Sequence, residues 1–278
     1  MPPESANHFV VVVLDSLRYD TWLEAAPSEL ARLGPVQRRF SYASWTAPSH
    51  FNLLMGLLPH TSPKGVYASE YYKDDFRRYS ERLGVPDIEF QSLLPSLFLP
   101  TYLKHSLGYR THAMVSMPVL NSRTLLNTDF DTYELMDRHN DMHAMLEQLD
   151  FTGDAPSFHL LNVGETHYPY ALPDEEPGEW PRISGVHGVV RALDGTDPTE
   201  RQGQFDLDQL AELRRRQVHA LEYLDGVFAE LFRRVPRNTW LVVTSDHGEL
   251  FGEEGYFGHG PINHEKVFEV PFVEGMVP

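Results

Sequence analysis

Two acidic positions of the sequence directly follow runs of strongly apolar residues. Asp15 ends the run 9–14, and Asp246 with His247 ends the run 240–244, inside the string TSDHGE. Ligands of open α/β sheets bind beyond the carboxyl ends of strands. Carboxylate oxygens suit hard divalent cations and imidazole suits zinc or manganese, so these three side chains indicate half of a metal site. The alternative is that each aspartate only caps the helix or turn after its strand.

The hydroxyl of Thr46 is a further candidate for chemistry. It lies in the string WTAPSH, where a helix over residues 51–58 would begin, with Pro48 in its first turn. One interpretation is that Thr46 is the N-cap of this helix and Ser49 an accessory. The other is that Thr46 is a nucleophile, because a helix amino terminus favours an anion and helps to stabilise an alkoxide. The segment alone leaves both interpretations open.

The elements that must hold these side chains alternate between strand-like and helix-like stretches. Residues 9–14, 158–163 and 240–244 are continuous apolar runs, typical of strands buried on both faces. Helix-like stretches lie at 51–58, 93–107 and 207–234, and Pro236 follows the last of them. This alternation predicts an α/β fold, a three-layer sandwich with a mainly parallel central sheet flanked by helices.

Two segments lack such periodicity. Residues 64–87 are rich in Tyr, Asp and Arg, and residues 168–205 carry many Pro, Gly, Asp and Glu. Both are predicted to be insertions, the second a long loop or lid. Residues 270–273 predict a final strand. Because neither a repeat nor a domain boundary is visible, residues 1–278 are predicted to form a single catalytic domain with insertions near 64–87 and 168–205.

The charge of the chain limits its partners. The 278 residues include 23 basic and 40 acidic ones, and the formal net charge is -17. Such a balance disfavours binding to nucleic acid or to anionic membranes. A small anionic ester is still a suitable substrate, because a bound metal ion inverts the field locally. We therefore expect a small-molecule partner, no nucleic acid and no membrane, and leave the oligomeric state open.

Cysteine is absent from the sequence, which excludes disulfides, thiolate metal sites and a cysteine nucleophile. The amino terminus has no basic segment, and its apolar run at 9–14 is too short for a signal core or a membrane span. No other segment approaches transmembrane length. A cytoplasmic location is therefore expected.

Five short strings, taken in order, resemble the sulfatase branch of the alkaline-phosphatase superfamily. They are LDSLRYD at 14–20, TAPSH at 46–50, HYPY at 167–170, SDHGE at 245–249 and GHG at 258–260. The first matches the family's Asp-x-x-Arg-x-Asp motif after a strand, and the second its nucleophile motif. Residues 265–272 resemble the strand entry that follows. The resemblance spans nearly the whole chain and implies one metal site built from Asp15, Thr46, Asp246 and His247.

The departures from the sulfatase pattern concern the nucleophile. True sulfatases oxidise a Cys or Ser to formylglycine, an aldehyde, whereas oxidation of Thr46 would give a ketone. His50 replaces the arginine that supports this group, and Ser16 stands where many sulfatases have a second aspartate. A threonine nucleophile resembles nucleotide pyrophosphatase-phosphodiesterases, phosphoethanolamine transferases and lipoteichoic-acid synthases. The resemblance therefore favours phosphate or phosphonate esters over sulfate esters.

The resemblance also implies the metal count and the substrate contacts. We expect one tight Zn2+ or Mn2+ site. Two-metal relatives add an aspartate where this chain has Val163, and Glu165 is the nearby substitute, so a second, weaker metal site is left open. His167 and His259 are expected to be catalytic, by stabilising or protonating the transferring group. The expected substrate-binding residues are His50, Lys64 and Arg18.

Together these features predict a metal-dependent hydrolase of phosphate or phosphonate esters that acts through a covalent threonine intermediate. A sulfuric ester hydrolase and a phosphoryl-group transferase of the same superfamily are the alternatives. The expected absence of membrane helices speaks against a lipid-modifying transferase. The intact nucleophile and metal ligands speak against a non-catalytic binding protein.

Overall fold

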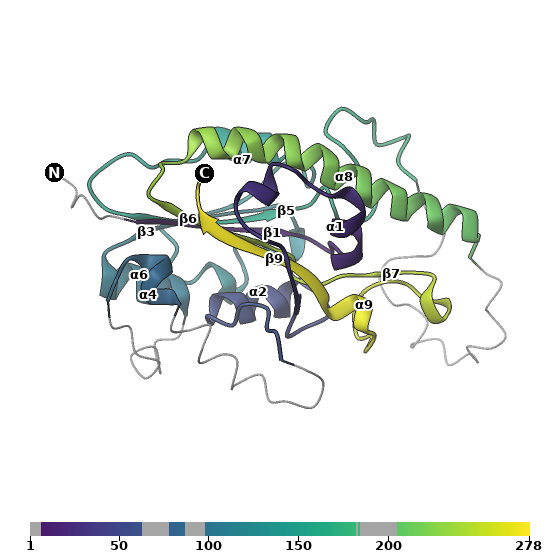
Figure 1. The fold of residues 1–278 in the computed structure, drawn as a ribbon, viewed down its shortest axis with the longest axis horizontal. Helices are drawn as coiled ribbons and strands as arrows, with labels where there is room; N and C mark the ends of the chain where they lie inside the picture. Colours follow the sequence, from purple (N-terminus) through teal and green to yellow (C-terminus); the bar gives the residue numbers. More distant parts are fainter. Residues whose placement is uncertain (1–6, 63–77, 87–97, 182, 184–204) are drawn as a thin grey trace.

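The computed structural model describes residues 7–62, 78–86, 98–181, 183 and 205–278, and it shows one central sheet with helices on both faces (Figure 1). Most of the two predicted insertions lies outside these residues. Of the first, only 78–86 are described, and of the second, only 168–181, 183 and 205. The assignment of the whole chain to a single domain stays a prediction.

Seven strands form the central sheet in the order β2-β9-β6-β1-β5-β3-β4. The five neighbours from β6 to β4 run parallel, and β9 is antiparallel to β2 and β6. The strands are β1 (His8–Leu14), β2 (Gln37–Phe40), β3 (Arg110–Val115), β4 (Thr132–Leu135), β5 (Ser157–Val163), β6 (Thr239–Thr244) and β9 (Glu269–Met276). A separate short hairpin pairs β7 (Leu250–Phe251) with β8 (Phe257–Gly258).

Helices cover both faces of the sheet and complete three layers (Figure 1). One face carries α1 (Tyr19–Ala25), α7 (Met142–Glu147), α8 (Leu207–Arg234) and the 3-10 turn η1 (Leu30–Arg32). The other face carries α2 (Thr46–Leu54), α4 (Tyr79–Leu83), α6 (Leu99–Leu107) and the 3-10 turns η2 (Pro118–Leu120) and η3 (Leu125–Asn127). Near the carboxyl end lie η6 (Glu253–Gly255) and α9 (Glu265–Phe268). The predicted three-layer α/β sandwich with a mainly parallel sheet is confirmed.

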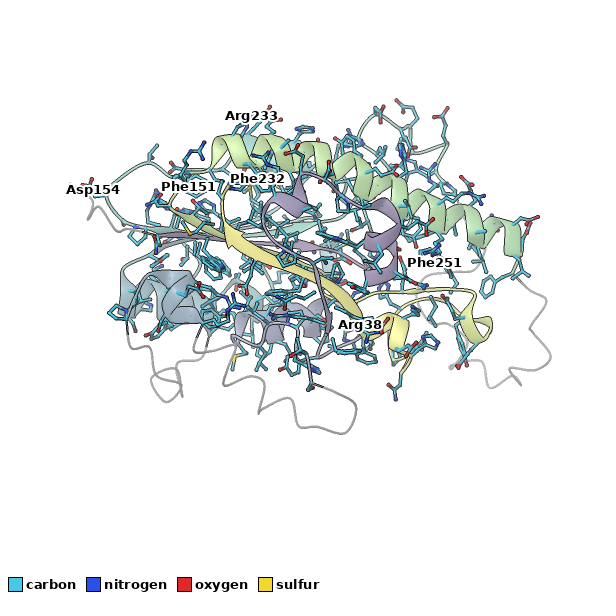
Figure 2. All side chains as sticks on the ribbon, viewed as in Figure 1. Arg38, Phe151, Asp154, Phe232, Arg233 and Phe251 are labelled. Atoms are coloured by element: carbon cyan, nitrogen blue, oxygen red, sulfur yellow. The ribbon has the colours of Figure 1, made fainter. Side chains whose placement is uncertain are left out.

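Two hydrophobic cores, one on each side of the sheet, explain why β1 is apolar throughout. Alternate side chains of a strand point to opposite faces. One core contains Val10, Val12 and Leu14, and the other contains Phe9, Val11 and Val13. Side chains fill the space between the sheet and both helix layers (Figure 2). A central parallel strand covered by helices on both faces has no position for an exposed polar residue.

The predicted elements agree closely with the observed ones where the apolar pattern is strong. β1, β5 and β6 each begin one residue before the predicted strand, and α8 has the predicted bounds 207–234. Helix α2 begins earlier than the predicted stretch 51–58 and ends at Leu54. Among the described residues, no helix has the length and apolar character needed to cross a membrane.

Candidate metal centre and nucleophile

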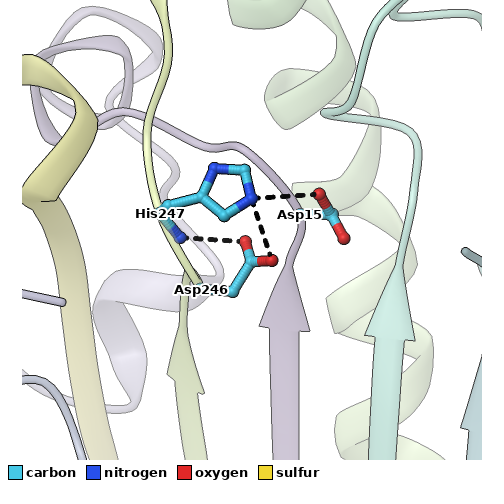
Figure 3. Close-up of side chains that lie close together, drawn as sticks. All are labelled: Asp15, Asp246 and His247. Atoms are coloured by element: carbon cyan, nitrogen blue, oxygen red, sulfur yellow. Dashed lines mark hydrogen bonds and ion pairs between the residues drawn. The ribbon is translucent and has the colours of Figure 1, made fainter. Parts of the chain in front are cut away.

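Three acidic and imidazole side chains meet at the carboxyl edge of the sheet (Figure 3). Asp15 follows β1, and Asp246 and His247 follow β6, which is its parallel neighbour. The ligand atoms of the three side chains all lie within 4.8 Å of one another. His247 Nε2 is 3.3 Å from Asp246 Oδ2 and 4.0 Å from Asp15 Oδ1. The predicted grouping of these residues is therefore what the fold produces.

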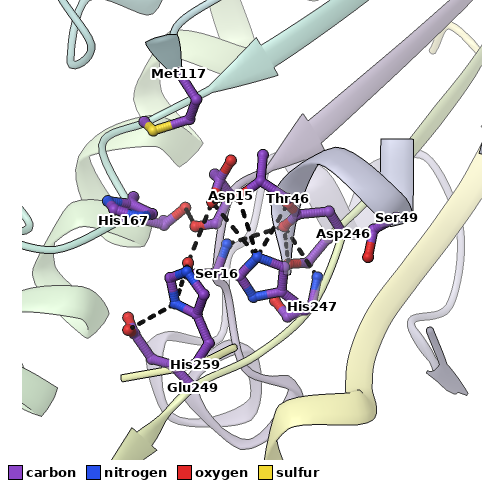
Figure 4. Close-up of polar contacts among 12 residues, drawn as sticks. Asp15, Ser16, Thr46, Ser49, Met117, His167, Asp246, His247, Glu249 and His259 are labelled. Carbon is purple, nitrogen blue, oxygen red and sulfur yellow. Dashed lines mark hydrogen bonds and ion pairs between the residues drawn. The ribbon is translucent and has the colours of Figure 1, made fainter. Parts of the chain in front are cut away.

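The hydroxyl of Thr46 joins this cluster (Figure 4). Thr46 Oγ1 lies 3.3 Å from His247 Nε2 and 3.5 Å from Asp15 Oδ1. Thr46 is the first residue of α2, whereas the N-cap is Trp45, and no side chain makes a capping hydrogen bond there. The interpretation of Thr46 as an N-cap is therefore wrong, because its hydroxyl faces the acidic cluster instead of the free backbone N–H groups of α2.

Two buried atoms of the cluster, His247 Nε2 and Asp246 Oδ2, are directed at the space between the three side chains. His247 Nδ1 donates to the carbonyl of Gly248 (2.9 Å), so Nε2 is the unprotonated nitrogen and faces the carboxylates. Asp246 Oδ1 accepts from the backbone N–H groups of His247 (2.9 Å) and Ser16 (3.1 Å). Asp246 Oδ2 is buried and has no hydrogen-bond partner among the described residues. Buried polar atoms are normally satisfied, so this donor set fits a divalent metal ion.

The carboxylate of Asp15 is oriented by an amide in the next strand. Asn162 Nδ2 in β5 donates to Asp15 Oδ2 (2.9 Å), which leaves Oδ1 for the cluster. Asn162 Oδ1 in turn accepts from the backbone N–H groups of Ser116 and Met117, at 3.1 Å each. Sequence reasoning missed Asn162. Its signal was a single amide inside the otherwise apolar run of β5.

The electrostatics of the cluster also favour a cation. Burial and the neighbouring Asp15 carboxylate raise the pKa of Asp246 well above its ordinary value. Burial alone would raise the pKa of Asp15 too, but attraction to His167 and the hydrogen bond from Asn162 help to lower that pKa. Burial lowers the pKa of His247 well below its ordinary value, so the imidazole is neutral. Two close carboxylates beside a neutral imidazole carry negative charge that no other side chain within this described cluster offsets. A bound metal cation would offset this charge.

The two predicted catalytic histidines lie beside the cluster (Figure 4). The ring of His259 is 4.2 Å from that of His247 and 5.4 Å from that of His167, measured between centroids. His259 Nδ1 lies 3.5 Å from both Glu249 Oε2 and Ser16 Oγ. The fold therefore brings both imidazoles next to the centre, and their catalytic roles stay predictions.

His50 lies beneath the centre, on the first turns of α2. Its Nδ1 donates to the carbonyl of Thr46 (2.9 Å) and is 3.7 Å from Asp246 Oδ2. The side chain is buried, and burial lowers its pKa. Its Nε2 has no hydrogen-bond partner among the described residues. The predicted substrate contact of His50 stays a prediction.

Of the other two predicted substrate contacts, the structure describes Arg18 but not Lys64. Arg18 is buried, and its guanidinium forms 2.6 Å ion pairs with both Asp20 and Glu253. It also donates to the carbonyl of Glu249 (3.2 Å). The predicted substrate contact of Arg18 stays a prediction. Lys64 lies outside the described residues.

Glu165, the expected substitute ligand for a second metal, is directed toward α7. Its Oε1 accepts from the backbone N–H of Met142 (2.8 Å), and burial raises its pKa to about 7. Within the described part of the chain, the only group of three ligands close enough to share an ion is the one at Asp15. A second, weaker metal site stays a prediction without support from Glu165.

The family follows from comparison with known proteins. The Sulfatase family model matches residues 7–274. The chain belongs to the sulfatase family. This confirms the superfamily indicated by the five strings, whose members are hydrolases or transferases that use a divalent metal. No curated protein matches the sequence.

Three solved structures illustrate the shared sulfatase fold. The C-terminal periplasmic domain of EptC from Escherichia coli, in complex with zinc, has a TM-score of 0.59 and 13% identity, over 99% of this chain and 74% of that one. A 2-O GAG sulfatase has a TM-score of 0.56 and 14% identity, over 98% and 64%. The phosphonate monoester hydrolase of Agrobacterium radiobacter has a TM-score of 0.55 and 14% identity, over 96% and 68%. At such identities the likeness is one of fold.

Proposed function

We propose that this sulfatase-family protein is a metal-dependent hydrolase of phosphate or phosphonate esters that acts through a covalent intermediate on Thr46. The observation that carries the proposal is the position of Thr46 Oγ1, 3.3 Å from His247 Nε2 and 3.5 Å from Asp15 Oδ1. The hydroxyl makes no capping hydrogen bond in α2. It is therefore available as a metal ligand and as an attacking group.

Asp15, Asp246 and His247 would hold the ion, with Thr46 as the fourth ligand. When bound, a divalent cation supplies Lewis-acid chemistry, which lowers the pKa of a coordinated hydroxyl and offsets charge on the phosphoryl oxygens. Zinc or manganese suits this carboxylate and imidazole set. The zinc in the similar EptC domain supports zinc. The amino terminus of α2 adds a favourable potential for the Thr46 alkoxide.

The residues of the chain then divide the reaction into two displacements. Thr46 loses its proton to solvent, and its oxygen forms a bond to phosphorus while the bond from phosphorus to the leaving-group oxygen breaks. His259 or His167 gives the leaving oxygen a proton. In the second step water attacks phosphorus, and the same imidazole takes a proton from that water. The bond to Thr46 breaks, and the threonine oxygen keeps the electron pair and regains a proton from solvent. Phosphate or phosphonate is released.

Two other reactions of the superfamily are alternatives. In a transferase the hydroxyl of an acceptor replaces water in the second step, and the likeness in fold to EptC supports this candidate. The experiment is product analysis with and without added alcohols. A sulfuric ester hydrolase is disfavoured, because Thr46 has no route to formylglycine. Intact-mass measurement should find Thr46 unmodified, and aryl sulfate turnover should be weak beside p-nitrophenyl phosphate or phenylphosphonate turnover.

The test of the nucleophile compares three variants at one position. Thr46→Ala should lower turnover by more than about 1,000-fold. It should change stability by about 1 kcal/mol or less, since no capping bond is lost and the contacts of the hydroxyl with His247 and Asp15 are long, at 3.3 and 3.5 Å. Thr46→Ser should keep part of the turnover, because a primary hydroxyl can also be activated by a metal, whereas Thr46→Asp should be inactive. The matched control is Ser49→Ala, which removes a hydroxyl one turn further along α2.

Near-native turnover of Thr46→Ala would rule out the covalent intermediate on Thr46 and favour direct attack by water.

We also propose that the substrate is a small ester and not nucleic acid, which the net charge of -17 supports. A second proposal is that the protein acts in the cytoplasm. Fractionation of cells that produce the protein tests the location. Turnover of a phosphodiester panel that includes oligonucleotides tests the substrate class.

A further inference from the structure

A fully buried amide lies in the middle of α8, on the sheet face opposite α2. Gln217 has no exposed surface. Its Nε2 donates to the backbone carbonyls of Ser16 (2.9 Å) and Thr166 (3.1 Å) and lies 3.4 Å from Glu249 Oε1. The two carbonyls can only accept, so they fix which end of the amide carries the hydrogens, and Gln217 Oε1 accepts from Thr21 Oγ1 (2.8 Å) in α1.

The three acceptors belong to three different loops, one after each of the neighbouring strands β1, β5 and β6. Each acceptor is at most two positions from a residue of the candidate centre: Ser16 from Asp15, Thr166 from His167, and Glu249 from His247. A single side chain therefore contacts the three loops that carry Asp15, His167 and His247. It does so from α8, which contributes no ligand of its own.

Ser16 shows why such a contact matters for geometry. Its φ is 62°, the left-handed region that a serine adopts only when its surroundings hold it there. Its N–H donates to Asp246 Oδ1 (3.1 Å), and its carbonyl accepts from Gln217. Gln217 therefore binds the carbonyl of Ser16, while the N–H of Ser16 orients the metal ligand Asp246.

Glu249 extends the contact to a catalytic candidate. Its Oε1 also accepts from Tyr170 Oη (2.6 Å), while its Oε2 lies 3.5 Å from His259 Nδ1. The carboxylate is buried, so its orientation depends on these few partners. Loss of Gln217 would remove one of them.

We propose that Gln217 is a positioning residue, which sets the relative placement of the loops after β1, β5 and β6 and thereby the metal affinity of the centre. The part about metal affinity rests on the proposed function, whereas the placement of the loops does not. Residues that orient metal ligands through hydrogen bonds change metal affinity about 10–100-fold when they are replaced.

The same helix offers a matched control. Asp225 is also buried in α8, and it accepts from the backbone N–H groups of Glu29 (3.0 Å) and Leu30 (2.9 Å). That turn carries no residue of the centre. Asp225→Leu and Gln217→Met both leave buried backbone groups without a partner, so both should lower the melting temperature.

The experiment compares wild type, Gln217→Met and Asp225→Leu by two readouts. In the absence of metal, hydrogen–deuterium exchange in Gln217→Met should quicken at residues 15–18, 164–168 and 246–250, whereas in Asp225→Leu it should quicken at 27–33. By chelator competition, Gln217→Met should raise the Kd for Zn2+ about tenfold or more, and Asp225→Leu should leave it unchanged. If Gln217→Met does not fold, Thr21→Val tests the same contact more mildly, because it frees only the carbonyl end of the amide.

Equal effects of the two variants on Zn2+ affinity, or exchange that does not quicken in the three loops, would overturn the proposal. Failure of the proposed function gives a different pattern. Wild type would then bind Zn2+ without turning over phosphate or phosphonate esters, while the exchange and affinity results for Gln217 would stand. If wild type bound no Zn2+, the exchange pattern alone would decide on Gln217.

Discussion

Asn162 in β5 donates a 2.9 Å hydrogen bond to Asp15 Oδ2, across the boundary between two parallel strands. The acceptor side of the same amide is occupied by the backbone N–H groups of Ser116 and Met117. The amide therefore cannot rotate without breaking three hydrogen bonds. It fixes which oxygen of Asp15 faces Thr46 and the metal site.

Asn162→Leu should weaken Zn2+ binding about 10-fold or more, because the carboxylate loses the donor that orients it. The variant should also lose about 1–3 kcal/mol of stability, since the buried N–H of Met117 loses its acceptor, whereas that of Ser116 keeps the backbone carbonyl of residue 162 (3.1 Å). Chelator competition and chemical denaturation measure the two effects. Asn140→Leu is the control, because that buried amide donates to the carbonyls of Ala171 and Leu172 instead. Equal Zn2+ affinity of Asn162→Leu and wild type would contradict the orienting role.

Asp246→Asn should abolish tight metal binding and yet stabilise the metal-free protein. The folded state raises the pKa of Asp246, so it holds a proton at a pH where the unfolded chain has lost it. Stability of wild type therefore falls as pH rises above the ordinary aspartate pKa of about 3.9. Asparagine keeps the Oδ1 acceptor and removes this loss. The gain should be larger at pH 8 than at pH 5.

Melting curves in EDTA and in excess Zn2+ check this prediction. Zn2+ at 100 times its Kd should stabilise wild type by about 2.7 kcal/mol and should not stabilise Asp246→Asn. A variant that melts below wild type in EDTA at pH 8 would show that the carboxylates do not repel each other.

Glu165→Gln should remove a pH dependence of stability. Burial raises the pKa of Glu165 from 4.5 to about 7, so the folded state retains a proton that the unfolded chain loses. Stability then decreases as pH rises from about 4.5 to about 7, by up to about 3 kcal/mol in total. Glutamine can still accept from the N–H of Met142. Denaturant unfolding should show that the variant is more stable than wild type at pH 8 but not at pH 5. An equal difference in the free energy of unfolding at both pH values would contradict the prediction.

Arg82→Met should be strongly destabilising. The Arg82 guanidinium in α4 contacts Glu274 in β9 at 2.7 and 3.0 Å, and both side chains are buried. Removing one partner of a buried pair costs about 3–5 kcal/mol, and the cost here should lie at the lower end because Glu274 keeps its contacts with Arg78 and Trp240. Arg215→Met, at an exposed pair with Glu212, should cost less than about 1 kcal/mol.

The cost of Arg82→Met should also depend on pH. Burial would raise the pKa of Glu274, but its bonds and attraction to Arg82 outweigh burial and lower it. The pair therefore stabilises the protein above the ordinary glutamate pKa and loses this effect as pH falls through the folded value. Urea unfolding at pH 7 and pH 3 measures the change. A cost that is equal at both would contradict the ion-pair explanation.

The central strands could be predicted because burial on both faces leaves a continuous apolar run, as in β1 and β6. The two edge strands, β2 and β4, could not be predicted in this way. β4 has the sequence TYEL with mostly exposed side chains, and β2 has QRRF, so neither shows an apolar period. Pairing with a neighbouring strand, which is a tertiary contact, makes them strands.

The centre shows the same division. Asp15, Asp246 and His247 could be predicted because a polar residue directly after a buried strand marks the edge where ligands bind. Gln217 could not, since one glutamine in a long amphipathic helix carries no sign of the loops it contacts. The cap interpretation of Thr46 was wrong because the helix begins one residue earlier than a cap at Thr46 requires, with Trp45 as the N-cap.

The place of β1 in the sheet has a consequence for synthesis of the chain. β1 is the first described strand, but it lies between β5 and β6, and its contact from His8 to Ser157 spans 149 residues. A ribosome adding about 5–20 residues per second needs roughly 7–30 s to reach β5. During that time the nascent chain presents an uncharged segment, VVVVL, that has no partner strand and a strong tendency to aggregate. Until β5 and β6 emerge, β1 therefore lacks both neighbours that later cover its edges, and its apolar run is open to aggregation.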